Sequence, residues 1–173
     1  LEYIIGRDNF YPAMRSYFNE WSYKHPTPTD FKRVMEKQSG MNLDWYFQQF
    51  LGTTKTIDYS IDEVVPGKKG TRVILKREGH MPMPVEFKVV MTDGSTKFYY
   101  IPLRAMRMAK NVAEDWETLA PWPWTHPYYE VELSDSFESI EVISLDPSMR
   151  VADTDLKNGV YKKGDQKVIF KGD

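Results

Sequence analysis

The first third of the chain carries the hydrophobic spacing of amphipathic helices. Between residues 8 and 21, large apolar side chains recur at intervals of three and four, which places them on one face of a helix. These side chains are Phe10, Met14, Tyr17, Phe18 and Trp21. We expect Asp8 to cap this helix, and Pro26 to end it, because the residue before a proline is pushed out of the helical region.

Two further short helices are predicted before residue 53. Thr27 stands at the N-cap of the next helix, with Pro28 at its first position and Asp30 three residues after the cap, the arrangement of a capping box. Ser39-Gly40 supplies a left-handed stop. Asn42 is then expected to cap a third helix over residues 43–51, which is crowded with aromatic side chains.

From about Thr56 the hydrophobic period changes from 3.6 to two. Alternating apolar and polar residues predict strands over 57–62, 71–77, 85–91, 96–103, 128–133 and 139–145. Asp93-Gly94 predicts a tight hairpin, and a terminal hairpin is expected through Gly159, Gly164 and Gly172. We therefore expect an α+β fold, with a short helical subdomain over residues 1–53 followed by an antiparallel β-sandwich over residues 54–173.

Composition excludes several classes of function. The 173 residues include 23 Lys or Arg and 25 Asp or Glu, a net charge of −2, so the basic surface that binds nucleic acid is not expected. The chain has no cysteine, and its three histidines are far apart in sequence, which excludes a thiolate zinc site and a local histidine pair. No apolar run is long enough to span a membrane. We predict no catalytic, cofactor-binding or metal-binding residue in this chain.

The most unusual stretch of the chain is rich in aromatic residues and prolines. Trp122, Trp124 and Tyr128 alternate there with Pro121, Pro123 and Pro127. Exposed together, the three rings could contact a sugar or a peptide, so they are the candidate ligand-contact residues of a β-sandwich binding module. Buried, they would close one end of the sandwich, and we favour burial because large rings usually drive core packing.

Two local patterns resemble metal sites but favour other interpretations. Met81 and Met83 flank a loop with His80 and could hold a soft metal such as copper(I), but methionines more often fill gaps between sheets. The segment 153–159 resembles a calcium loop, but it lacks the glutamate that such a loop needs six residues after its glycine. A turn stabilised by Asp and Asn side chains fits that segment better.

The helical part also carries an ordered series of short motifs. The series is Asn9-Phe10, Tyr17-Phe18, Lys24-His25-Pro26-Thr27-Pro28, Asp30-Phe31, Ser39-Gly40, Leu43-Asp44-Trp45-Tyr46-Phe47 and Gln49-Phe50. It resembles the region downstream of the active site in aminopeptidase N-type zinc metallopeptidases, the gluzincins of peptidase family M1. Asn42, Tyr46 and Phe50 depart from the family pattern, which has Asp, Phe and Trp there. The likeness covers about residues 6–60, and the sandwich resembles the bacterial members more loosely.

The resemblance implies a zinc aminopeptidase as the parent protein. In that family a His-Glu-x-x-His helix and a later Glu bind zinc, and the first Glu activates water. Those motifs do not occur in this chain, and we expect them upstream of Leu1, inside a longer protein. The resemblance therefore implies a fragment that is inactive alone and holds no cofactor, while the parent holds zinc. Its expected partner is the upstream catalytic domain, which it buttresses and whose cleft for peptide substrates it helps to wall. The compartment is left open between a bacterial periplasm or cell envelope and the cytoplasm.

Overall fold

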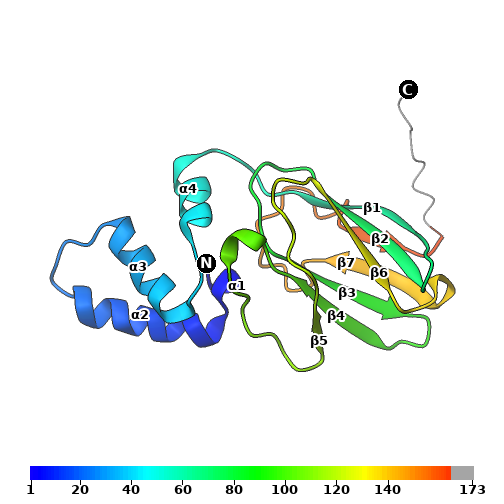
Figure 1. The fold of residues 1–173 in the computed structure, drawn as a ribbon, viewed down its shortest axis with the longest axis horizontal. Helices are drawn as coiled ribbons and strands as arrows, with labels where there is room; N and C mark the ends of the chain where they lie inside the picture. Colours follow the sequence, from blue (N-terminus) through cyan, green and yellow to red (C-terminus); the bar gives the residue numbers. More distant parts are fainter. Residues whose placement is uncertain (165–173) are drawn as a thin grey trace.

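The structure, a computed structural model, describes residues 1–164 of the chain. Its helices gather at one end of an elongated molecule and its strands at the other (Figure 1). Within the described residues the α-helices are α1 (Glu2–Ile5), α2 (Arg7–Trp21), α3 (Pro28–Ser39) and α4 (Asp44–Gly52). The predicted change from helices to strands is therefore confirmed.

The start and the end of α3 follow the sequence signals closely. The Thr27 hydroxyl accepts a hydrogen bond from the Asp30 amide, and the Asp30 carboxylate accepts one from the Thr27 amide, which completes a capping box. Gly40 ends the helix at φ 69°, a left-handed conformation that suits a residue without a side chain.

The other helix starts differ from the prediction. Gly6, not Asp8, is the N-cap of α2, because the chain turns at Gly6 with φ 79° after the short helix α1, which the hydrophobic spacing did not predict. Asp8 lies in the first turn instead, where the helix dipole favours a carboxylate. Leu43, not Asn42, is the N-cap of α4. Asn42 lies one position before this cap, and its side-chain oxygen accepts a hydrogen bond from the Asp44 amide at 3.3 Å.

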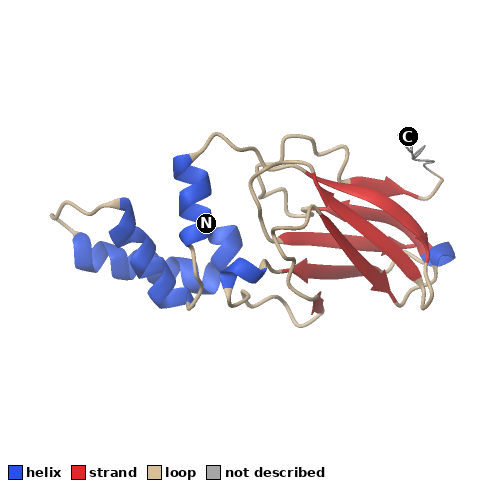
Figure 2. Ribbon diagram, turned by 45° about the horizontal axis from the view of Figure 1, so that its top comes forward, coloured by secondary structure: helices blue, strands red, loops and turns tan. Residues whose placement is uncertain are grey.

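The strands form two sheets within the described residues. One sheet has the order β1-β2-β6 and the other the order β5-β4-β3-β7-β8. Their strands are β1 (Tyr59–Pro66), β2 (Thr71–Arg77), β3 (Val85–Met91), β4 (Thr96–Ile101), β5 (Trp116–Thr118), β6 (Tyr128–Leu133), β7 (Ile140–Leu145) and β8 (Val160–Lys162), with short 3-10 helices at η1 (Arg104–Met106) and η2 (Phe137–Ser139). The two sheets lie face to face (Figure 2).

The antiparallel sandwich is confirmed, with local departures. The short strand β5 pairs parallel to β4, whereas the other strand pairs are antiparallel. The strand expected over 57–62 begins two residues later and continues to Pro66. At the C-terminal end, β8 pairs with β7, and the rest of the expected hairpin, including Gly172, lies outside the described residues.

A continuous hydrophobic core joins the helices to the sandwich. Tyr3, Ile4 and Ile5 of α1 are buried in the same cluster as the strands, and the Tyr3 hydroxyl donates to the Pro84 carbonyl at 3.2 Å. Beyond α3, the Asn42 amide donates to the Met106 carbonyl at 3.0 Å. The helices are thus fixed to one end of the sandwich at two places.

Candidate docking surface on the helical part

A groove of about 430 Å³ opens between α2, α3 and α4. It is lined almost entirely by apolar and aromatic side chains, which are Leu1, Tyr17, Pro26, Pro28, Phe31, Tyr46, Phe47, Phe50 and Leu51, together with Thr27. Its size falls in the range of sites that hold ligands or partner side chains. We call these residues the apolar groove.

Aromatic contacts between the helices build the floor of this groove. Tyr17 of α2 meets Phe31 of α3 edge-on, with ring centroids 5.0 Å apart, and Phe31 lies 6.2 Å from Phe47 of α4. On the outer side, the rings of Tyr46 and Phe50 stack with centroids 5.2 Å apart. The three helices therefore contact one another through aromatic rings, and these rings also line the groove.

Much of this aromatic surface is open to solvent. α4 has no fully buried residue, and at its end Phe50 and Leu51 are exposed, Leu51 by 60%. On α2, Phe18 is also exposed. Contiguous apolar surface of this kind is typical of sites that bind another surface, and this makes the groove the candidate docking surface.

Polar contacts hold α4 in place where the core does not. The Lys32 ammonium of α3 bonds to the Asp44 carboxylate at the first turn of α4, and this bond raises the pKa of Lys32 and lowers that of Asp44. The Trp45 indole N–H donates to the Asn42 carbonyl at 3.0 Å. These contacts orient α4 so that its aromatic side chains reach the groove.

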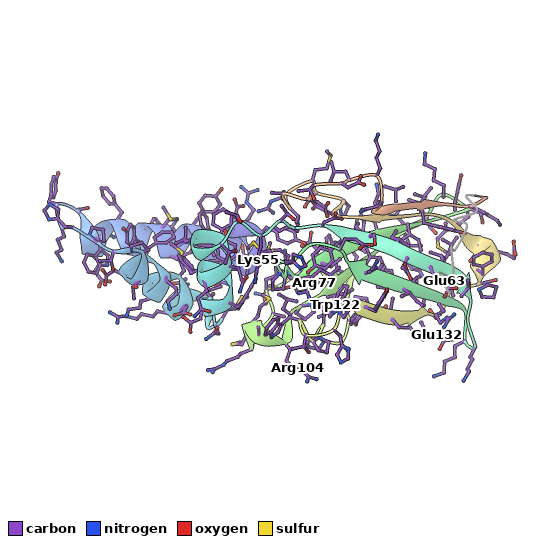
Figure 3. The ribbon with its side chains drawn as sticks, turned by 90° about the horizontal axis from the view of Figure 1, so that it is seen from above. Lys55, Glu63, Arg77, Arg104, Trp122 and Glu132 are labelled. Atoms are coloured by element: carbon purple, nitrogen blue, oxygen red, sulfur yellow. The ribbon has the colours of Figure 1, made fainter. Side chains whose placement is uncertain are left out.

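The three candidate ligand-contact residues of the sandwich do not form one surface. Trp122 is only 1% exposed, and its indole N–H donates to the His126 carbonyl at 2.9 Å. It lies at the end of the sandwich that faces the helices (Figure 3), between the rings of Tyr59 and Tyr129. Trp124 and Tyr128 are each 50% exposed, so two of the three rings are accessible to a ligand and Trp122 is not.

The remaining sequence patterns have ordinary structural roles. Met81 and Met83 are buried in the core, while His80 is exposed. The segment 153–159 is a turn in which the carboxylates of Asp153 and Asp155 each accept a hydrogen bond from the backbone amide two residues later in the chain. Across residues 1–164, no group of three or more His, Asp or Glu residues is placed to hold a metal ion.

The sequence did not point to the most deeply buried charges. Glu86 occupies a polar position in the alternation of β3, and such positions usually face solvent, but its side chain is only 6% exposed. It bonds to Lys110, whose side chain is 8% exposed and whose ammonium also donates to the Tyr3 carbonyl at 2.7 Å. Burial lowers the pKa of Lys110, and the Glu86 carboxylate opposes that shift.

Comparison with known protein families finds no family model that matches the chain, and a search of curated proteins finds no match either. None of the helices in the described part of the chain is both long and apolar enough to cross a lipid bilayer.

Proposed function

We propose that this chain is the non-catalytic C-terminal part of a zinc aminopeptidase. In this proposal the helical part packs against an upstream catalytic domain through the apolar groove and helps to wall its peptide cleft. The ordered motif series from Asn9 to Phe50 supports the family, and several members of that series line the groove or lie beside it.

The observation that carries the proposal is the unpartnered aromatic surface on α2, α3 and α4. The rings of Tyr46, Phe47 and Phe50 face a groove instead of a closed core, although the neighbouring sandwich is well packed. Burying this surface against another domain would stabilise both parts, by about 25 cal/mol for each Å² of apolar area removed from water.

Hydrolysis of amino-acid anilides tests the non-catalytic role. We expect the isolated chain, with zinc added, to give no turnover above background, because the zinc-binding motifs of the resembling family do not occur in its sequence. Zinc-dependent turnover by the isolated chain would refute the proposal.

A matched pair of leucine substitutions tests the docking role in the full-length protein. Leu51→Ser removes an apolar side chain from the groove, whereas Leu156→Ser removes one of similar exposure, 50%, from the loop before β8. We expect Leu51→Ser to destabilise the full-length protein by about 1–3 kcal/mol, because that leucine is buried there, and to leave the isolated chain almost unchanged. Leu156→Ser should change neither. Equal effects of Leu51→Ser in both proteins would contradict docking at the groove.

A further inference from the structure

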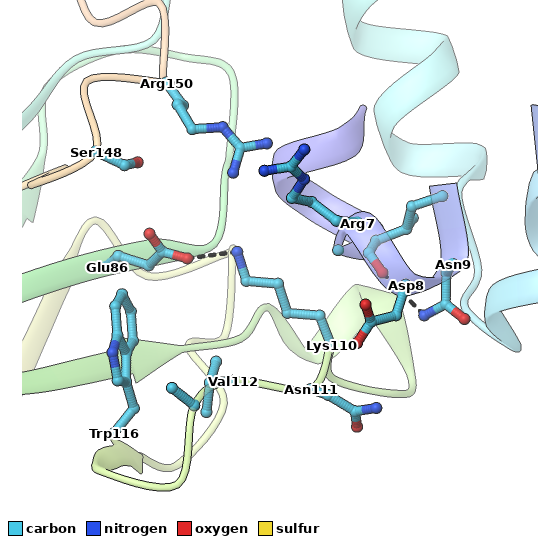
Figure 4. Close-up of a pocket in the computed structure, with 13 residues that line it drawn as sticks. Arg7, Asp8, Asn9, Glu86, Lys110, Asn111, Val112, Trp116, Ser148 and Arg150 are labelled. Atoms are coloured by element: carbon cyan, nitrogen blue, oxygen red, sulfur yellow. Dashed lines mark hydrogen bonds and ion pairs between the residues drawn. The ribbon is translucent and has the colours of Figure 1, made fainter. Parts of the chain in front are cut away.

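A second cavity, of about 330 Å³, lies where the helices meet the sandwich (Figure 4). Three segments that are distant in sequence each bring a cation to its wall. These cations are Arg7 in the first turn of α2, Lys110 in the loop after η1, and Arg150 in the loop after β7. Trp116 and Val112 supply an apolar side. The cavity therefore combines positive charge with an aromatic wall in a volume that suits a small ligand.

The two arginines are incompletely neutralised. Arg7 Nε lies 3.4 Å and Arg150 Nη2 lies 3.2 Å from the same oxygen, Glu2 Oε1. Both distances exceed the 2.7–2.9 Å or so of a charge-assisted hydrogen bond. Within residues 1–164, Glu2 is the only carboxylate in an ion pair with either arginine. Two guanidinium groups thus share one carboxylate and keep N–H donors to spare, and Figure 4 shows them pointing toward one another.

The other charges of the cavity are accounted for separately. Lys110 is committed to Glu86 and to the Tyr3 carbonyl, as described above, so it adds little free charge. Asp8 also lines the cavity, but in Figure 4 it lies away from the two guanidinium groups. Asp8 is thus free to accept an N–H from the body of a ligand whose anionic end lies at the arginines.

We propose that this cavity binds a small carboxylate-bearing ligand of the N-acyl amino acid or peptide C-terminus class. The carboxylate accepts from the N–H groups of Arg7 and Arg150 that do not face Glu2, because planar guanidinium groups match its geometry. The apolar side chain packs on Trp116 and Val112, and an amide N–H faces Asp8. This inference is independent of the proposed aminopeptidase parentage.

An NMR titration of the whole chain with N-acetyl-L-phenylalanine tests the proposal. Its matched control is N-acetyl-L-phenylalaninamide, which has the same body without the charge. We expect saturable amide shifts at Arg7 to Asn9, at Lys110 to Val112 and at Arg150 with the acid only. Arg7→Gln and Arg150→Gln should each weaken the acid's binding by about tenfold or more, as expected for a charged hydrogen bond. Arg33→Gln, which removes an exposed arginine from α3, should leave binding unchanged.

Several results would overturn the proposal. If N-acetyl-L-phenylalaninamide bound as tightly as the acid, the arginines would have no role in binding. The same would follow if Arg7→Gln and Arg150→Gln both kept the affinity for the acid while their NMR spectra showed a native fold. Inorganic phosphate that binds as tightly as the acid would remove the role of the apolar wall. A lack of saturable shifts at millimolar probe, or shifts centred on the apolar groove, would refute the site itself.

Discussion

Replacing Lys110 by methionine should destabilise the protein more than most single substitutions. The Lys110 ammonium bonds to the Glu86 carboxylate and the Tyr3 carbonyl, and lies 4.2 Å and 5.2 Å from the ring centroids of Tyr3 and Tyr100. Methionine keeps the apolar stem of the side chain and removes the charge. Glu86 then stays buried with no cation beside it.

The expected loss follows from the burial of both charges. Removing one partner of a buried ion pair costs about 3–5 kcal/mol, mainly because the remaining charge is uncompensated. Since small domains are stable by about 5–15 kcal/mol in total, Lys110→Met should remove a substantial part of the free energy of unfolding. The double variant Lys110→Met/Glu86→Leu removes both charges, so it should lose clearly less than the single variant.

Urea denaturation followed by tryptophan fluorescence and circular dichroism measures these losses. The reasoning would be refuted if Lys110→Met lost less than about 1 kcal/mol, the size of an exposed ion pair. It would also fail if the free energy of unfolding lost by Lys110→Met/Glu86→Leu equalled the sum of the losses of Lys110→Met and Glu86→Leu, because the two side chains would then not be coupled.

Three further predictions concern the core, a close backbone contact and pH. Trp122→Ala should lower the free energy of unfolding, measured by urea denaturation, by about 3–5 kcal/mol, whereas Trp124→Ala should change it by no more than about 0.5 kcal/mol. Equal losses would contradict the burial of Trp122. Gly79→Ala places a Cβ 2.5 Å from a backbone oxygen and should cost about 1–3 kcal/mol, while Gly52→Ala meets no atom within 4 Å and should be neutral or stabilising. Burial raises the pKa of the Tyr99 phenol to about 12, whereas the unfolded phenol has a pKa of about 10. The protonated Tyr99 phenol therefore contributes fully to the free energy of unfolding below about pH 10, and this contribution falls as pH rises toward 12. A free energy of unfolding that stays constant from about pH 10 to 12 would contradict this prediction.

Local signals in the sequence predicted the fold well where neighbouring residues decide the structure. The capping box of Thr27 and Asp30 and the stop at Gly40 form as expected, because each depends on residues within a few positions of one another. The strands β2, β3 and β6 match their predicted ranges, since their alternation of apolar and polar residues is regular.

Features that depend on distant contacts were not predicted from the sequence. Helix α1 has four residues, too few to show a period, and it is recognisable only from its burial against the sandwich. The burial of Glu86 depends on Lys110, 24 positions later, and no local pattern indicates that pairing. The cavity at Arg7 and Arg150 likewise arises because tertiary packing brings two ends of the chain together.

The candidate docking surface was predictable in composition but not in shape. The crowding of aromatic residues over 43–51 is visible in the sequence, and it indicated a helix with a large apolar face. Whether that face is closed by the sandwich or left open depends on how α4 is oriented by Lys32, Asp44 and Asn42. The Lys32–Asp44 ion pair connects α3 to α4, so hydrophobic spacing alone cannot reveal it, whereas the contact of Asn42 with Asp44 is local.

Aminopeptidase activity of the full-length protein tests the central proposal most directly. We expect the full-length protein to hydrolyse amino-acid anilides, to lose that activity when a chelator removes zinc and to regain it when zinc is returned, while residues 1–173 alone stay inactive under all three conditions. A full-length protein that folds, binds zinc and still shows no hydrolysis of any amino-acid anilide, or that hydrolyses them without zinc, would contradict the proposal.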